Sequence, residues 1–142
     1  ALTLMYRVTT RKAAEFHKPA DIETIRAHQA AYAAAVDDKN ALAMISTNRD
    51  FHAAIAVAGR NPYYGSLFLR LLDDGRRLLR LYYQSFDDNL PRRYVAEHDG
   101  MIVAIAARDV GECDRLATAH ADQIVQQIQK LIISEKRDAV PL

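Results

Sequence analysis

Apolar residues recur at intervals of three and four along most of the chain, and few segments alternate with a period of two. Intervals of three and four return a side chain to the same face of an α-helix, whereas alternation is typical of a half-buried strand. Only five glycines and four prolines interrupt the 142 residues, and residues that favour helices are frequent. The sequence therefore predicts an all-α protein without a sheet.

Residues that start or stop helices divide the chain into six expected helices. Their approximate ranges are 3–16, 21–36, 41–58, 62–86, 91–107 and 110–134. Asp21 is the expected N-cap of the second helix, Gly59 the stop of the third, and Asn61 the N-cap of the fourth. Because the connections are short, we expect an antiparallel bundle that forms one domain over residues 1–142.

The charge balance and the cysteine content limit the partners and the cellular compartment of such a domain. The formal net charge is +1, which indicates no basic surface for nucleic acid. Cys113 is the single cysteine, so an internal disulfide is excluded and a reducing compartment is favoured. No apolar run approaches the roughly 20 residues that cross a bilayer, and the opening segment ALTLM is too short for a signal peptide. We expect a cytoplasmic domain with no membrane partner.

Three of the expected helices carry a histidine on their apolar face. The faces are Ile45, Asn48, His52, Ile55; Val95, His98, Ile102, Ile105; and Leu116, His120, Ile124, Ile128. A buried polar group without a partner costs about 1–3 kcal/mol, and one shared metal ion would satisfy all three imidazoles. Asn48, one turn before His52, can add an oxygen ligand. Such a set suits a divalent transition metal, zinc first, with nickel or manganese as alternatives.

Two other interpretations of these histidines remain open at this point. They can be hydrogen-bonded core residues of a metal-free dimerisation bundle, in which case a chelator leaves the melting temperature unchanged. They can also hold a catalytic metal in a hydrolase, which needs a general base beside the metal-bound water. Glu97 is the nearest candidate, but it lies about 100° away from the inward face of its helix. We therefore expect no enzyme activity. Of the remaining histidines, we expect His17 to be solvated and His28 to be structural or a pocket wall.

Three segments of the chain resemble the FCD domain, the C-terminal effector-binding domain of FadR-subfamily regulators in the GntR family of bacterial transcription factors. These segments read NRDFHAAIAVAGRNPYY, AEHDGMIVAIAARD and DRLATAHADQI, and the resemblance extends from about residue 19 to residue 133. It implies a homodimeric helical bundle with a central metal or ligand cavity. A small carboxylate effector bound there would modulate DNA binding.

By position, the resemblance assigns the metal site to Asn48, His52, His98 and His120. The family has an aspartate where this chain has Asn48, which offers a carbonyl oxygen but no charge. The site would keep a charge of +2 instead of +1, so we expect weaker metal retention, partly offset by stronger attraction for an anionic effector. Asp50 is no substitute, because two residues along a helix turn a side chain by about 200°.

Other departures from the family concern the effector clamp and the DNA-binding domain. The family's first helix usually opens with R..LE, whose arginine can hold a carboxylate, and this motif is absent from the start of ALTLMYRVTTRKAAEF. Arg76 and Arg80 are alternative effector-binding candidates, because a guanidinium matches a carboxylate, although a solvated helix face is the more usual state of an arginine. Arg108 replaces the glycine of the family's GD. The chain is too short to include the family's winged helix–turn–helix domain, so we expect DNA contact only through a missing N-terminal domain.

Overall fold

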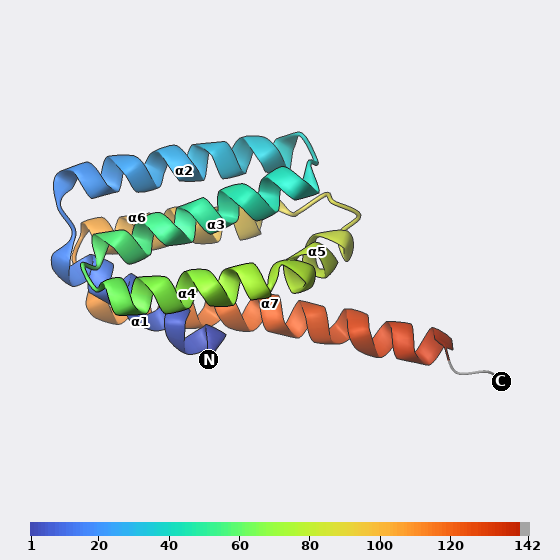
Figure 1. The fold of residues 1–142 in the computed structure, drawn as a ribbon. Coiled ribbons are helices and arrows are strands. Elements are labelled where there is room, and N and C mark those ends of the chain that lie inside the picture. Colours follow the sequence, from blue (N-terminus) through green and yellow to red (C-terminus); the bar gives the residue numbers. More distant parts are fainter. Residues whose placement is uncertain (140–142) are drawn as a thin grey trace.

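The computed structural model describes residues 1–139 and consists, over that range, of α-helices joined by short turns (Figure 1). The helices are α1 (Leu2–Phe16), α2 (Pro19–Asp37), α3 (Ala41–Ala58), α4 (Pro62–Asp74), α5 (Arg76–Gln84), α6 (Arg92–Ala106) and α7 (Val110–Ala139). The all-α prediction is confirmed. The expected helix over 62–86 is in fact two helices, because Gly75, a residue of low helix propensity, lies between α4 and α5.

The chain reverses direction from each helix to the next, except from α4 to α5, and so forms an antiparallel bundle (Figure 1). Helix α2 packs on α3, α1 packs on α7, and α6 lies against both α2 and α7. The C-terminal part of α7 continues beyond the other helices. Within residues 1–139, no helix is both long enough and apolar enough to cross a membrane.

One expected cap residue, Asp21, has a different role, whereas Gly59 and Asn61 cap their helices as expected. Lys18, not Asp21, is the N-cap of α2; the Asp21 carboxylate lies in the first turn and accepts a hydrogen bond from the Lys18 backbone N–H at 2.7 Å. Helix α3 does end before Gly59, but Arg60 is the residue with a positive φ, 59°. Gly59 is needed for another reason, because a Cβ there would lie 2.8 Å from the Cβ of Lys12. Asn61 caps α4 as expected and accepts from two backbone N–H groups.

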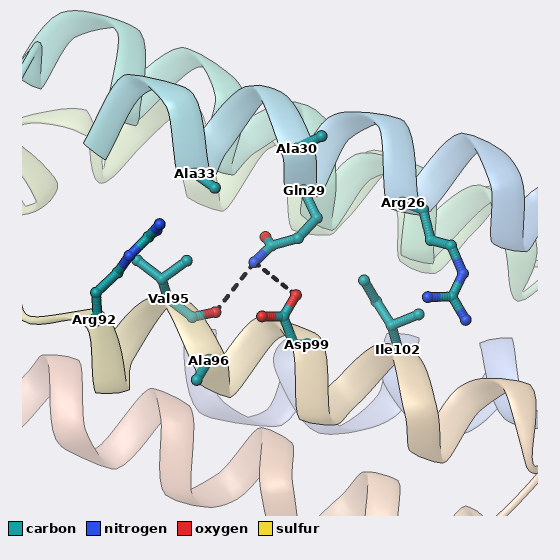
Figure 2. Close-up of a pocket in the computed structure, with 9 residues that line it drawn as sticks. All are labelled: Arg26, Gln29, Ala30, Ala33, Arg92, Val95, Ala96, Asp99 and Ile102. Carbon is teal, nitrogen blue, oxygen red and sulfur yellow. Dashed lines mark hydrogen bonds between the residues drawn. The ribbon is translucent and has the colours of Figure 1, made fainter. Parts of the chain in front are cut away.

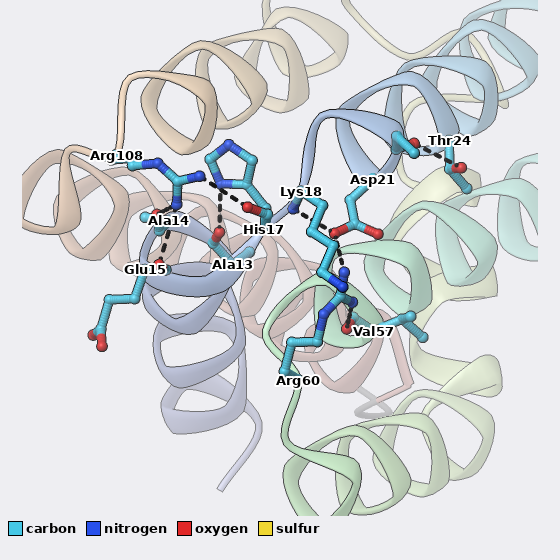
Figure 3. A network of polar contacts seen from close by, with 11 residues as sticks. Ala13, Ala14, Glu15, His17, Lys18, Asp21, Thr24, Val57, Arg60 and Arg108 are labelled. Carbon is cyan, nitrogen blue, oxygen red and sulfur yellow. Dashed lines mark hydrogen bonds and ion pairs between the residues drawn. The ribbon is translucent and has the colours of Figure 1, made fainter.

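The turn between α6 and α7 is tied to the end of α1 by Arg108 (Figure 3). Its guanidinium donates to the backbone carbonyls of Ala14, Glu15 and His17 at 2.9–3.1 Å. Carbonyls at a helix C-terminus have no partner within the helix, and a cation there also complements the helix dipole. The expectation that His17 is solvated was wrong: its side chain is buried, and its Nδ1 donates to the carbonyl of Ala13.

Three clusters of buried side chains form the interior of the bundle. One is centred on Tyr32 and Tyr83, a second on Phe51 and Met101, and a third on Tyr6. Aromatic rings from all three clusters contact the inward histidines: Tyr32 from the first, Phe51 from the second and Tyr6 from the third. The polar centre of the molecule is therefore enclosed where the apolar clusters meet.

Candidate metal centre

The structure brings together the three histidines that the sequence analysis singled out. His52 comes from α3, His98 from α6 and His120 from α7. One ring nitrogen from each lies within 4.8 Å of those of the other two, and the ring centroids are 5.0–5.5 Å apart. None of the three residues is more than 5% exposed. Three imidazoles from three helices thus share one buried point.

Hydrogen bonds on the far side of two rings determine which nitrogen faces that point. His98 Nδ1 lies 2.8 Å from Gln29 Oε1, and His120 Nδ1 lies 2.9 Å from Glu97 Oε1. Both partners are acceptors, so each Nδ1 carries the proton and donates. In the neutral form of either ring, the Nε2 atom then has a free lone pair, which is the form that binds a metal ion.

Four buried side-chain atoms within residues 1–139 have no hydrogen-bond partner. They are Asn48 Nδ2, His52 Nε2, His98 Nε2 and His120 Nε2. Each unsatisfied group costs about 1–3 kcal/mol, so four of them in one region call for a ligand. Rotating the Asn48 amide by 180° exchanges the positions of its nitrogen and its oxygen. The side-chain oxygen can then take the place of the unpartnered nitrogen and serve as a metal ligand.

The donor set fits a divalent transition metal. Three nitrogens bound tetrahedrally to one zinc ion at about 2.0–2.1 Å are about 3.4 Å apart. Because the histidine nitrogens lie within 4.8 Å of one another, the rings need to close by at most about 1.4 Å. Burial, and next the neighbouring His120, lower the pKa of His52 and of His98 well below the usual range for histidine. Both rings are therefore neutral at pH 7, as metal ligation requires.

Aromatic side chains exclude water from the histidines. Phe51 stacks on His98 with ring centroids 4.1 Å apart and an interplanar angle of 12°. Tyr6 of α1 meets His52 edge to face at 4.8 Å and also contacts His120. Such surroundings strengthen electrostatic interactions with any ion at the centre.

Gln29 of α2 is a site residue that sequence analysis missed. Its side chain is buried and accepts from His98, while its Nε2 donates to the Val95 carbonyl at 3.1 Å and to Asp99 Oδ1 at 3.2 Å (Figure 2). It forms part of the wall of a groove of about 500 Å³ between α2 and α6. The signal was present, because Gln29 follows Ile25 by four residues on an apolar face, the same pattern that identified the histidines.

The remaining candidates lie away from this buried point. Glu97, considered as a general base, bonds to the outer nitrogen of His120 and is therefore a partner of that ring. Arg76 and Arg80 of α5 are exposed, and Arg80 forms an ion pair with Asp88 at 2.9 Å. Their effector-binding role stays a prediction. His28 is half-buried in the wall of a surface pocket on α2 and α3, as one of its two expected roles requires.

Comparisons with known proteins agree with the resemblance seen in the sequence. The family model of the FCD domain matches residues 5–123. Among solved structures, E. coli McbR/YncC has a similar fold, with a TM-score of 0.77 over 93% of this chain at 18% sequence identity, and this chain covers 64% of that protein. No curated protein matches the chain.

The FCD match includes all three histidines of the centre and most of the helical bundle. FCD domains are regulatory, and the bundle has the helical architecture of that family. The chain belongs to the FCD domain family, the effector-binding regulatory domains of GntR-type transcription regulators.

Proposed function

We propose that this domain senses a small carboxylate at a divalent metal ion held by His52, His98, His120 and Asn48. The observation that carries the proposal is the convergence of three partnerless imidazole nitrogens in a dry interior, with a partnerless amide one helical turn away. Zinc is the first choice because it accepts three nitrogens and one oxygen, and nickel or manganese are alternatives. A metal ion bound there would supply a Lewis-acidic anchor for a carboxylate oxygen.

The protein's own contribution is to orient the ligands and exclude water. Gln29 and Glu97 hold two imidazoles in the tautomer that leaves Nε2 free. Tyr6 and Phe51 cover the rings, so a carboxylate that enters must displace or pass between these side chains. Because Tyr6 belongs to α1, a bound effector changes the packing of the first helix, and so the signal can reach the chain that precedes it.

In the complete regulator, we propose that this signal acts on a DNA-binding domain N-terminal to α1. The domain itself, residues 1–142, senses the effector and forms a homodimer in the cytoplasm, and DNA contact belongs to the other domain. A ligand shifts such an equilibrium only by the difference in its affinity for the two states. Arg76 and Arg80 are candidates for a second contact to the effector, provided that their helix moves toward it.

A metal assay and thermal unfolding test the metal proposal. Purified protein stripped with a chelator should regain about one zinc ion per chain and melt at a higher temperature when zinc is added, because a ligand that binds only the folded state stabilises it. The His52→Ala and His98→Ala variants should lose both effects. If zinc, nickel and manganese all leave the melting temperature unchanged, the metal-free bundle is the correct interpretation.

A further inference from the structure

We infer that metal and anion binding are interdependent at this centre, because the four proposed ligands carry no charge. The inference rests on the metal site proposed above and adds a rule for its regulation. The centre holds a divalent cation firmly only when a small anion binds with it.

The uncharged character of the ligands follows from their identity and surroundings. A histidine that binds a metal ion through a ring nitrogen is a neutral imidazole, and His52, His98 and His120 are each at most 5% exposed. Asn48 contributes an amide and is 2% exposed. A divalent ion among these groups would leave a net charge of +2 in an interior that solvates charge poorly.

The nearest carboxylates act on the centre only through other side chains. Glu97 accepts from the outer nitrogen of His120, and 28% of its side chain is exposed to solvent, which screens its charge. Asp99 is linked to His98 only through Gln29. Both reduce the excess charge, but neither lies on the side of the rings where the free nitrogens meet.

A monovalent anion at an open coordination position lowers this charge directly, from +2 to +1. By thermodynamic linkage, the factor by which the anion raises metal affinity equals the factor by which the metal raises anion affinity. Coupling between two sites is typically about 5- to 150-fold, and we expect this centre to fall in that range. Asn48 sets the size of the effect, since an aspartate at that position would supply the missing charge permanently.

Zinc affinity measured with and without a simple carboxylate tests the inference. The probes are acetate and acetamide, which have the same shape but differ in charge, used at constant ionic strength with a chromophoric chelator as competitor. For the unmodified chain, acetate should raise zinc affinity at least about fivefold, and acetamide should leave it unchanged. Asn48→Asp should bind zinc more tightly without acetate, and its response to acetate should fall below about twofold.

Asn40→Asp is the matched control, because it adds the same charge to the same helix. Asn40 is the N-cap of α3, a position that aspartate fills equally well, and it lies two turns before Asn48. This variant should keep the full response to acetate.

The inference is overturned if zinc binds the unmodified chain equally well with and without acetate, or if acetamide matches acetate. A chain that binds no zinc under any condition overturns the proposed metal site itself. If Asn48→Asp does not fold, the acetate–acetamide comparison on the unmodified chain decides alone.

Discussion

Single residues determine the chemical state of the centre. Gln29 has one acceptor and one donor group, and both are used: the oxygen binds His98, and the nitrogen binds Val95 and Asp99. Since the nitrogen already donates, the oxygen must face the imidazole, and the proton must reside on His98 Nδ1. One amide thus fixes the tautomer of a proposed metal ligand.

Replacing Gln29 by alanine should therefore weaken zinc binding without unfolding the domain. Loss of a partner that orients a metal-binding histidine typically costs about 10–100-fold in metal affinity. The measurement is the same chelator competition, with circular dichroism as a check on the fold. Gln123→Ala is the control, because Gln123 bonds to Tyr82 instead of a histidine and should leave zinc affinity intact. Equal zinc affinity in Gln29→Ala would show that the hydrogen bond has no role in metal binding.

Cys113 should be unreactive in the folded domain. Its side chain is fully buried, and burial, together with Asp109 and Glu112, raises the pKa of its thiol from about 9 to about 12. At pH 8 this rise lowers the thiolate fraction about 1,000-fold. A disulfide reagent should therefore label the protein only after denaturant is added, and labelling then reports unfolding. Rapid labelling without denaturant would mean that the first turns of α7, where Cys113 lies, open readily.

At the scale of helices, the C-terminal end of α3 lies very close to α1 at Gly59. Gly59 packs against the backbone and Cβ of Lys12, which leaves no room for a side chain. On the neighbouring helix α4, Gly65 has open space around it, and a methyl group added there would lie 3.9 Å from its nearest neighbour, the Cβ of Ala56. A side chain can therefore be added at Gly65 without a steric clash, but not at Gly59.

Alanine at the two glycines should change stability in opposite directions. Gly59→Ala should lower the free energy of unfolding by about 1–3 kcal/mol, because α1 and α3 must move apart. Gly65→Ala should raise it by about 0.5–1 kcal/mol, because alanine favours the helix and meets no obstacle. Urea unfolding of both variants provides the comparison. A stabilised Gly59→Ala variant would contradict the close packing of α1 on α3.

Arg108 shows how an unusual residue is accommodated between two helices. It has a φ of 57°, in the left-handed region that favours glycine, and the FCD pattern has a glycine here. Its guanidinium, however, binds three carbonyls at the end of α1 (Figure 3). The hydrogen bonds offset the unfavourable backbone conformation, and they link the first helix to the turn that precedes α7.

For the molecule as a whole, the buried histidines make stability depend on pH. The pKa values of His52 and His98 are lowered in the folded state, so below about pH 6.5 the unfolded chain binds more protons than the folded chain. Stability is therefore fully present above that pH and falls as the pH decreases.

Chelator-treated protein should lose up to about 1.4 kcal/mol of stability per histidine for each pH unit below 6.5. Urea unfolding between pH 7.5 and pH 5 measures this slope. His98→Gln, which cannot be protonated, should have a shallower slope than the unmodified chain. A stability that is constant over this range would mean that the histidines are solvated in the metal-free state.

The sequence by itself determined the helical class, most helix boundaries and the inward direction of three histidines and Asn48. These features depend on local periodicity and capping, which residues within one or two turns control. The same local rules failed at Gly75, where they predicted one continuous helix. They place Gln29 on an apolar face, but its role depends on a residue of another helix, which they do not reveal.

Only the tertiary structure decided which groups meet. Gln29 and His98 are 69 residues apart in sequence, Arg108 and His17 are 91 apart, and no local pattern connects either pair. Burial of His17 and the tight contact at Gly59 likewise depend on how α1 lies against its neighbours. The physical reason is that periodicity specifies the face on which a side chain lies, whereas the partner it meets depends on the packing of all the helices together.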